Sequence, residues 1–108
     1  MYASQKNPNE EYMNPNKYIV VLTAYEYSIL NKNYLISTIC KKQLESATTY
    51  EKDAEEVVEL SLILDELENL TGYVAAESNH ARTKRQREDL GSICDYFEAR
   101  LSEIKRRK

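Results

Sequence analysis

The chemistry with the clearest sequence signature involves Glu77 and His80, which lie three positions apart. On a helix this spacing places a carboxylate and an imidazole one turn apart on the same face. Helical bundles that bind a pair of metal ions use this motif, with further glutamates from facing helices. His80 is the only histidine, so a metal-binding helical bundle would have to assemble across subunits through Glu77 and His80. The alternative, which we expect, places His80 at a helix end, solvated or hydrogen-bonded to a carbonyl group, with no metal and no cofactor.

The two cysteines, Cys40 and Cys94, are the other candidates for chemistry. They form no Cys-x-x-Cys motif, and each lies on an apolar face at helical spacing, where a reduced cysteine behaves as a small hydrophobic residue. Nothing in the sequence provides the electropositive enclosure that activates a thiol, and there is no glycine-rich phosphate loop. We therefore expect a protein that is not an enzyme, with reduced cysteines in the cytoplasm.

A short basic segment follows His80 and gives the strongest argument for a nucleic-acid partner. Its cationic residues are Arg82, Lys84, Arg85 and Arg87. Domains that bind nucleic acids are usually strongly basic, whereas this chain of 108 residues has a net charge of −3, and Glu88 and Asp89 directly follow the segment. A small nucleic-acid-associated protein that uses residues 82–87 is therefore the alternative function, with phosphate contact favoured over base reading.

Nine tyrosines accompany a single phenylalanine and no tryptophan. Tyrosine combines a rigid apolar ring with a polar hydroxyl group, which suits surfaces that are half-buried or contact another protein. The first apolar segment of the chain also has aliphatic residues on more sides than one neighbouring helix can cover. The residues expected to contact a partner are Leu22, Tyr25, Ile29, Tyr34 and Tyr73.

The elements that position these residues are expected to be helices. Apolar residues recur at steps of three and four, which keeps them on one helical face. The two stripes are Val57, Leu60, Leu64, Leu67, Thr71 and Val74, and then Leu90, Cys94, Phe97, Leu101 and Ile104. Together with the first apolar segment, they predict helices over about 17–44, 51–77 and 83–105. The run Asn31-Lys32-Asn33 suggests a bend in the first of these helices. Capping-box patterns at Thr48–Glu51 and Thr83–Gln86 open the last two.

Two alternatives remain open in this assignment. Residues 18–22 are rich in β-branched side chains and would form a strand in isolation, but no second β-rich run is evident as its partner. Residues 51–105 contain no proline and could form one long helix, which would need a dimer to cover its apolar stripe. A hairpin of two helices is favoured over that long helix.

The expected fold is therefore all-α, with three helices of which the C-terminal two form an antiparallel helical hairpin. These helices belong to a single helical domain at 17–108. Residues 1–16 are polar and contain both prolines, and we expect them to form a flexible, disordered N-terminal arm. No apolar run has the length of a membrane span.

These observations predict a non-enzymatic helical protein-interaction module. We expect it to self-associate as a homodimer or larger helical bundle, and to bind or inhibit a partner protein as an inhibitor or adaptor. The richness in Asn, Lys, Ile, Tyr and Glu is typical of AT-rich genes, including those of many phages and mobile elements. An accessory protein of a phage or mobile element is therefore the expected setting.

Overall fold

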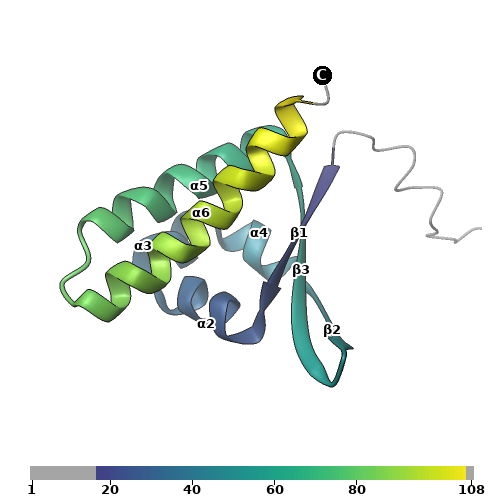
Figure 1. Cartoon of the computed structure of the whole chain (residues 1–108), viewed down its shortest axis with the longest axis horizontal. Helices are drawn as coiled ribbons and strands as arrows, with labels where there is room; N and C mark the ends of the chain where they lie inside the picture. The colour runs from purple at the N-terminus through teal and green to yellow at the C-terminus, as the bar shows by residue number, and fades with distance from the viewer. Residues whose placement is uncertain (1–16, 107–108) are drawn as a thin grey trace, which may run out of the picture.

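The computed structural model describes residues 17–106, which form a three-stranded antiparallel sheet and a layer of helices (Figure 1). The elements in chain order are β1 (Lys17–Thr23), α2 (Ala24–Lys32), α3 (Tyr34–Ile39), α4 (Lys41–Glu45), β2 (Thr48–Lys52), β3 (Glu55–Ile63), α5 (Leu64–Asn79) and α6 (Lys84–Arg106). The strand order in the sheet is β1-β3-β2, and the helices lie on one side of it. The flexible arm expected at 1–16 lies outside the described residues.

The all-α helical-bundle fold predicted from the sequence is wrong, because two segments assigned to helices contain strands. The start of the helix predicted at 17–44 forms β1, and the first part of the helix predicted at 51–77 forms β2 and β3. β1 pairs antiparallel with β3, with Tyr18 opposite Leu62. The strand-then-helix alternative for residues 18–22 is therefore right, and β3 is the partner strand that the sequence did not reveal.

The apolar pattern of β3 fits both a helix and a strand. Steps of three and four join Val57, Leu60 and Leu64, whereas simple alternation joins Val58, Leu60 and Leu62. The alternating residues are the buried ones, with exposed fractions of 3, 0 and 0%. Alternation prevails because pairing with β1 buries one face of both strands, an effect of tertiary contacts that local periodicity does not contain.

A two-residue turn joins β2 to β3 at the place where the sequence predicts the first turn of a helix. Asp53 and Ala54 have positive φ angles of 54° and 67°, and Lys52 pairs with Glu55 across them. Positive φ at both central residues is the signature of a type I′ turn, whose twist matches that of the flanking strands. Thr48 is consequently the first residue of an edge strand rather than a helix N-cap.

The helix predicted at 17–44 is divided by side chains that cap shorter helices. Thr23 ends β1 and caps α2: its Oγ1 accepts the Glu26 N–H at 3.0 Å, and the Glu26 carboxylate accepts the Thr23 N–H at 2.9 Å. Asn33 separates α2 from α3, and its Oδ1 accepts the Ile36 N–H at 2.9 Å. Because such caps satisfy the free amides at a helix start, they allow the chain to change direction at both places.

The C-terminal helical hairpin is present, although its first helix begins later than predicted. α5 begins at Leu64, whereas α6 covers almost the residues predicted for the last helix. Thr83 Oγ1 accepts the Gln86 N–H at 3.1 Å, which caps α6 as the second capping-box pattern predicts. The two helices run antiparallel side by side (Figure 1). A single helix over 51–105 is therefore excluded.

The core lies between the sheet and the helices, and Phe97 of α6 is its largest fully buried side chain. Every element except β2 contributes to it. The other members of the core cluster are Val20, Leu22, Leu30, Ile36, Cys40, Leu44, Leu60, Leu62, Leu67, Leu70, Val74, Leu90, Ile93, Cys94 and Ile104. The apolar stripe of α6 and the part of the first stripe that lies in α5 are thus core-facing, as predicted.

Candidate functional site

A cavity of about 380 Å³ lies at one corner of the molecule, where the α5–α6 turn meets the end of α2. This volume is within the range of small-ligand and side-chain pockets. The residues that line this corner cavity are Ile29, Lys32, Asn33, Glu77, His80, Ala81, Arg82, Gln86, Asp89 and Leu90. Its wall therefore combines apolar side chains with both cations and carboxylates.

Asn33 connects the two sides of the corner cavity. While its Oδ1 caps α3, its Nδ2 donates to Glu77 Oε1 at 2.9 Å. This pair ties the α2–α3 junction to the last turns of α5, across a large separation in sequence. The Glu77 carboxylate consequently has a hydrogen-bond donor from within the protein.

His80 caps the C-terminus of α5, and its Nδ1 lies 2.8 Å from the carbonyl oxygen of Ala76. A carbonyl oxygen only accepts hydrogen bonds, so Nδ1 carries the proton and Nε2 of the neutral ring is an acceptor. This is the helix-end position that the sequence analysis favoured for His80. Within residues 17–106, no group of three or more histidine, cysteine, aspartate or glutamate side chains could hold a metal ion.

Asp89 is the second carboxylate of the corner cavity, and Tyr25 and Arg85 both approach it. Tyr25 Oη donates to Asp89 Oδ2 at 2.6 Å, Arg85 Nη2 donates to Tyr25 Oη at 3.2 Å, and Arg85 Nε lies 3.8 Å from Asp89 Oδ2. The negative charge of Asp89 is therefore compensated by its own helix and by α2.

The cations of the predicted basic patch differ in their partners. Besides Arg85, Lys84 lies 3.8 Å from the Glu88 carboxylate, and Arg87 donates to the Ala81 carbonyl oxygen at 3.3 Å. Arg82 makes no ion pair or hydrogen bond with any described residue, and the same holds for Lys32 on the opposite wall of the corner cavity. The structure thus brings one residue of the patch, Arg82, together with Glu77 and His80.

The residues predicted to contact a partner have different positions. Leu22 is 1% exposed and packs in the core, so it is not available to a partner. Ile29 lines the corner cavity, and Tyr73 is half-buried against the core. Tyr25 is half-exposed beside Asp89, whereas Tyr34 is 83% exposed.

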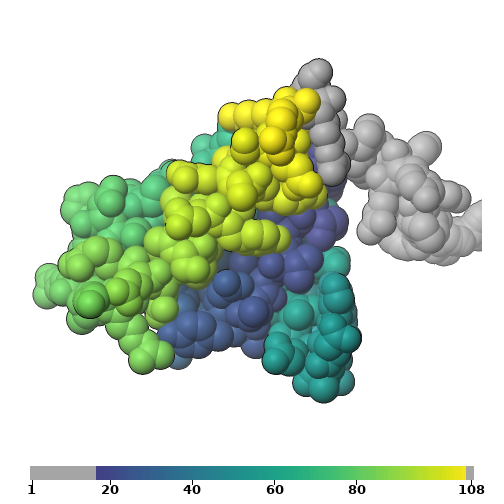
Figure 2. Space-filling model, viewed as in Figure 1, coloured from purple at the N-terminus to yellow at the C-terminus, as the bar shows by residue number. Residues whose placement is uncertain are grey.

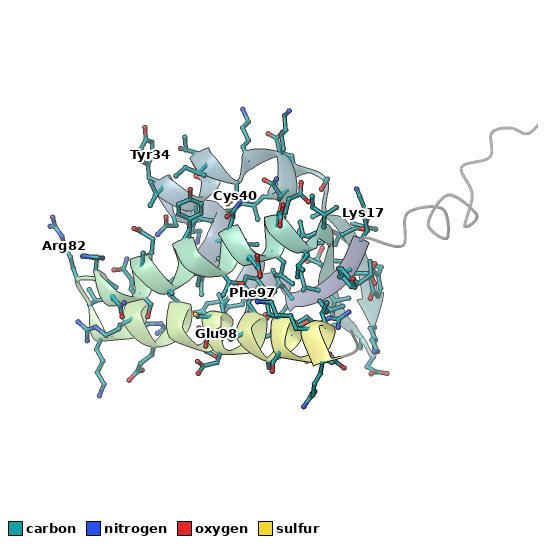
Figure 3. The ribbon with its side chains drawn as sticks, turned by 90° about the horizontal axis from the view of Figure 1, so that it is seen from above. Lys17, Tyr34, Cys40, Arg82, Phe97 and Glu98 are labelled. Carbon is teal, nitrogen blue, oxygen red and sulfur yellow. The ribbon has the colours of Figure 1, made fainter. Side chains whose placement is uncertain are left out.

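Tyr34 belongs to an exposed apolar patch on α3, next to Asn33 in the chain. Leu35 and Ile39 complete this α3 patch, with exposed fractions of 36 and 47%. Figure 3 shows Tyr34 pointing away from the body on one side, while Glu98 lies on the opposite side and Arg82 extends from the hairpin turn. The α3 patch begins at the residue after Asn33, which lines the corner cavity. Sequence reasoning missed the cavity because its walls come from segments that only tertiary packing brings together.

Both cysteines are free and buried. Burial raises the pKa of the Cys40 thiol. Burial, reinforced by the negative charges of Glu98 and Asp95, raises the pKa of the Cys94 thiol to about 11. The two thiols are consequently protonated near neutral pH, when a thiol is a poor nucleophile.

No helix in the part of the chain that the structure describes has the length and apolar character needed to cross a membrane. Comparison of the chain with known proteins gives no match to any family model, curated protein or solved structure. The geometry of the corner cavity and its surroundings therefore provides the basis for a functional assignment.

Proposed function

We propose that the chain is a non-enzymatic, cytoplasmic protein-interaction module whose corner cavity binds an acidic segment of a partner protein. One observation carries this proposal: the carboxylates of the cavity have hydrogen-bond partners within the chain, whereas two of its cations have neither an ion pair nor a hydrogen bond with any residue between 17 and 106. Glu77 accepts from Asn33 and Asp89 accepts from Tyr25. Lys32 and Arg82 face the same cavity with no counter-ion among the described residues. The unsatisfied charge is positive, and a carboxylate is its natural complement.

The apolar part of the recognition comes from inside and beside the corner cavity. Ile29 and Leu90 line it, and the exposed side chains of the α3 patch continue the apolar surface outward. Protein interfaces typically combine apolar and aromatic contacts with a few charged hydrogen bonds at their edge. We therefore propose that the bound segment carries an aliphatic or aromatic residue close to an aspartate or glutamate.

The side chains that could perform catalysis support a binding function rather than an enzymatic one. The thiols of Cys40 and Cys94 are buried with raised pKa values. His80 uses its Nδ1 proton in the cap of α5, and the Glu77 carboxylate is oriented by Asn33. Free cysteines also suit a reducing compartment, which supports a cytoplasmic location. Inhibition or adaptation of a host complex by a phage or mobile-element accessory protein remains within this proposal.

Nucleic-acid binding is less well supported by the same geometry. Phosphate contact requires cations that can exchange their partners for a phosphate group. Lys84, Arg85 and Arg87 already contact Glu88, Asp89 and a carbonyl oxygen, respectively. Two cations that line one cavity and have no counter-ion among residues 17–106 suit one carboxylate-bearing segment better than an extended phosphate backbone.

The proposal is tested with a displayed library of short random peptides, selected on the wild-type protein. The enriched peptides are then labelled and titrated by fluorescence anisotropy against two double variants. Lys32→Gln/Arg82→Gln should weaken binding by about tenfold or more, equivalent to roughly 1.4 kcal/mol. As a control, Lys41→Gln/Arg106→Gln also removes one lysine and one arginine, from exposed positions outside the cavity. This variant should bind the peptides with nearly unchanged affinity.

Two results would contradict the proposal. One is a set of enriched peptides without acidic residues, or with affinities that the Lys32/Arg82 variant does not alter. The other is binding of a labelled DNA or RNA oligonucleotide, lost in the Lys32/Arg82 variant, together with no selected peptide. The second result would favour the nucleic-acid alternative.

A further inference from the structure

The two edges of the sheet differ in whether their backbone groups have partners. In an antiparallel sheet, every second residue of an edge strand directs its N–H and C=O groups away from the neighbouring strand. In β1 these residues include Ile19 and Val21. Tyr96 Oη of α6 accepts the Val21 N–H at 2.9 Å, and Arg100 Nε donates to the Ile19 carbonyl oxygen at 3.0 Å. Side chains of α6 therefore close the β1 edge.

The β2 edge has no such partners among residues 17–106. Because the backbone groups of Val21 point away from the sheet, the β1 residues on either side of it bond to Val58 and Leu60 of β3. The β3 residues between these two direct their N–H and C=O groups toward β2. From the β2–β3 register, Thr49 and Glu51 are then the β2 residues whose backbone groups point away from the sheet. No hydrogen bond to these groups is formed by any residue between 17 and 106. All five residues of β2 are exposed.

The position of β2 also makes it accessible. The β2–β3 hairpin projects from the body at the lower right of Figure 2, away from the helices that close the β1 edge. It lies at the other end of the molecule from the α5–α6 turn (Figure 1), whose residues His80, Ala81 and Arg82 line the corner cavity. A chain that paired with β2 would consequently leave the corner cavity open.

We propose that β2 pairs antiparallel with β2 of a second copy of the chain, with the two-fold axis beside Tyr50. In this register, Thr49 of each copy is opposite Glu51 of the other, and the two residues exchange two backbone hydrogen bonds. The register contains two symmetry-related Thr49–Glu51 pairs, which would join the two three-stranded sheets into a single six-stranded sheet. This dimer is independent of the proposed binding to the corner cavity.

The side chains favour this register over its two neighbours. An axis beside Glu51 would place two Glu51 carboxylates opposite each other, and like charges in that position are destabilising. An axis beside Thr49 would require the Ala47 N–H, which already donates to the Leu44 carbonyl oxygen at 3.3 Å. The axis beside Tyr50 instead places the Thr49 hydroxyl opposite the Glu51 carboxylate.

Tyr50 gives the proposed axis an apolar contact. Its ring is 37% exposed, and its Oη donates to Glu59 Oε2 at 2.8 Å, which orients the ring over β3. Residues facing each other on a two-fold axis between hydrogen-bonded pairs have their side chains closest together, with Cα atoms about 4.5 Å apart. The two Tyr50 residues would therefore form a direct cross-strand pair, and their rings would meet at the axis when each releases its hydrogen bond to Glu59.

Sedimentation equilibrium of the full chain tests the dimer, with two substitutions of opposite charge at one exposed position. Thr49→Lys places an ammonium opposite Glu51 of the second copy and should tighten the dimer by about threefold or more. Thr49→Glu places a carboxylate there and should weaken it by a similar factor. Both variants keep the wild-type circular dichroism spectrum if they fold. A chain that is monomeric at roughly 1 mM, or a dimer that responds equally to both variants, would overturn the proposal.

Disulfide trapping tests the position of the axis. Cα atoms about 4.5 Å apart allow a disulfide, so Tyr50→Cys should give a covalent dimer under mild oxidation. Tyr34→Cys, whose site is 83% exposed on α3, is the matched control and should crosslink much more slowly. Equal rates for the two variants, or no crosslink through position 50, would show that β2 does not pair with itself.

Discussion

Ala54 provides a sharp test of the β2–β3 hairpin, because the structure and the helix predicted from the sequence require opposite effects of the same substitution. Ala54 has a φ of 67° in the type I′ turn. A residue with a Cβ atom in the left-handed region costs about 1–2 kcal/mol, and glycine avoids this cost. Against this, glycine loses roughly 0.5–1 kcal/mol more conformational entropy on folding than alanine. Ala54→Gly should therefore increase the free energy of unfolding by about 0.5–1 kcal/mol.

If residues 51–77 were helical, the same substitution would lower the free energy of unfolding by about 1 kcal/mol, the propensity difference between glycine and alanine. Urea unfolding followed by circular dichroism distinguishes the two signs, and the midpoint should move without a change in slope. Ala99→Gly, at an exposed position within α6, is the control and should lose about 1 kcal/mol. A loss of stability in Ala54→Gly similar to that of Ala99→Gly would refute the hairpin.

Three further substitutions test other parts of the structure. Tyr96→Phe removes the acceptor of the Val21 N–H and should lower the free energy of unfolding by about 1 kcal/mol in urea; no loss would mean that α6 does not close the β1 edge. Leu22→Asp places an unpaired charge in the core, where Leu22 is 1% exposed, and should therefore unfold the protein. Circular dichroism should show loss of structure in this variant and a folded protein in Tyr34→Asp. A folded Leu22→Asp protein would contradict the position of β1. Folding raises the pKa of the Cys94 thiol from 9.0 to about 11, so the unfolded state loses the thiol proton at a lower pH than the folded state. The stability that this difference contributes is present below pH 9 and is lost between pH 9 and 11. The stability of Cys94→Ala should accordingly decline less steeply over that range than that of the wild type, and equal slopes would argue against the burial of this thiol.

The sequence predicted α6 well because the apolar residues in this segment fit only the helical period. The spacing of Leu90, Cys94 and Phe97 fits a helix and no alternating pattern, and Thr83 and Gln86 form the expected start. Local periodicity and local capping therefore both indicate the structure that tertiary packing also favours.

The strands could not be predicted with the same rules. The apolar residues of 55–63 fit both the helical period of three to four residues and the two-residue period of a strand. The choice between helix and strand depends on β1, which lies more than thirty positions earlier in the chain. β1 and β3 each lack a stable state without the other, because a strand buries its face only when paired. The polar residues Glu59 and Ser61, which alternate with the buried leucines, were the available signal for a strand.

The candidate site was partly accessible from the sequence. Glu77, His80 and Arg82 are neighbours in the chain, and the turn between α5 and α6 was predicted to hold them. Ile29 and Asn33 complete the corner cavity from a segment that the sequence assigned to one uninterrupted helix. The role of Asn33 depends on the break between α2 and α3, which the run Asn31-Lys32-Asn33 suggested only as a bend.

The dimer and the corner cavity have a joint consequence. Since β2 lies at the other end of the molecule from the α5–α6 turn (Figure 1), which borders the cavity, a two-fold dimer through β2 would leave both cavities accessible. A partner with two acidic segments, or two copies of one partner, would then gain avidity from the second contact. The Thr49→Glu variant, with its weaker dimer, should show a smaller gain while its affinity for a single peptide is preserved.

Nuclear magnetic resonance can locate the binding site of an acidic segment residue by residue. A peptide enriched in the selection is titrated into the ¹⁵N-labelled full chain, and the backbone amide shifts are mapped. The largest shifts should fall on the cavity wall, including Asn33, Ala81 and Gln86, and Lys32→Gln/Arg82→Gln should need about tenfold more peptide to reach the same shifts. Shifts concentrated on β2 or on the outer face of the sheet, with the cavity wall unchanged, would contradict the proposed binding of an acidic segment in the corner cavity.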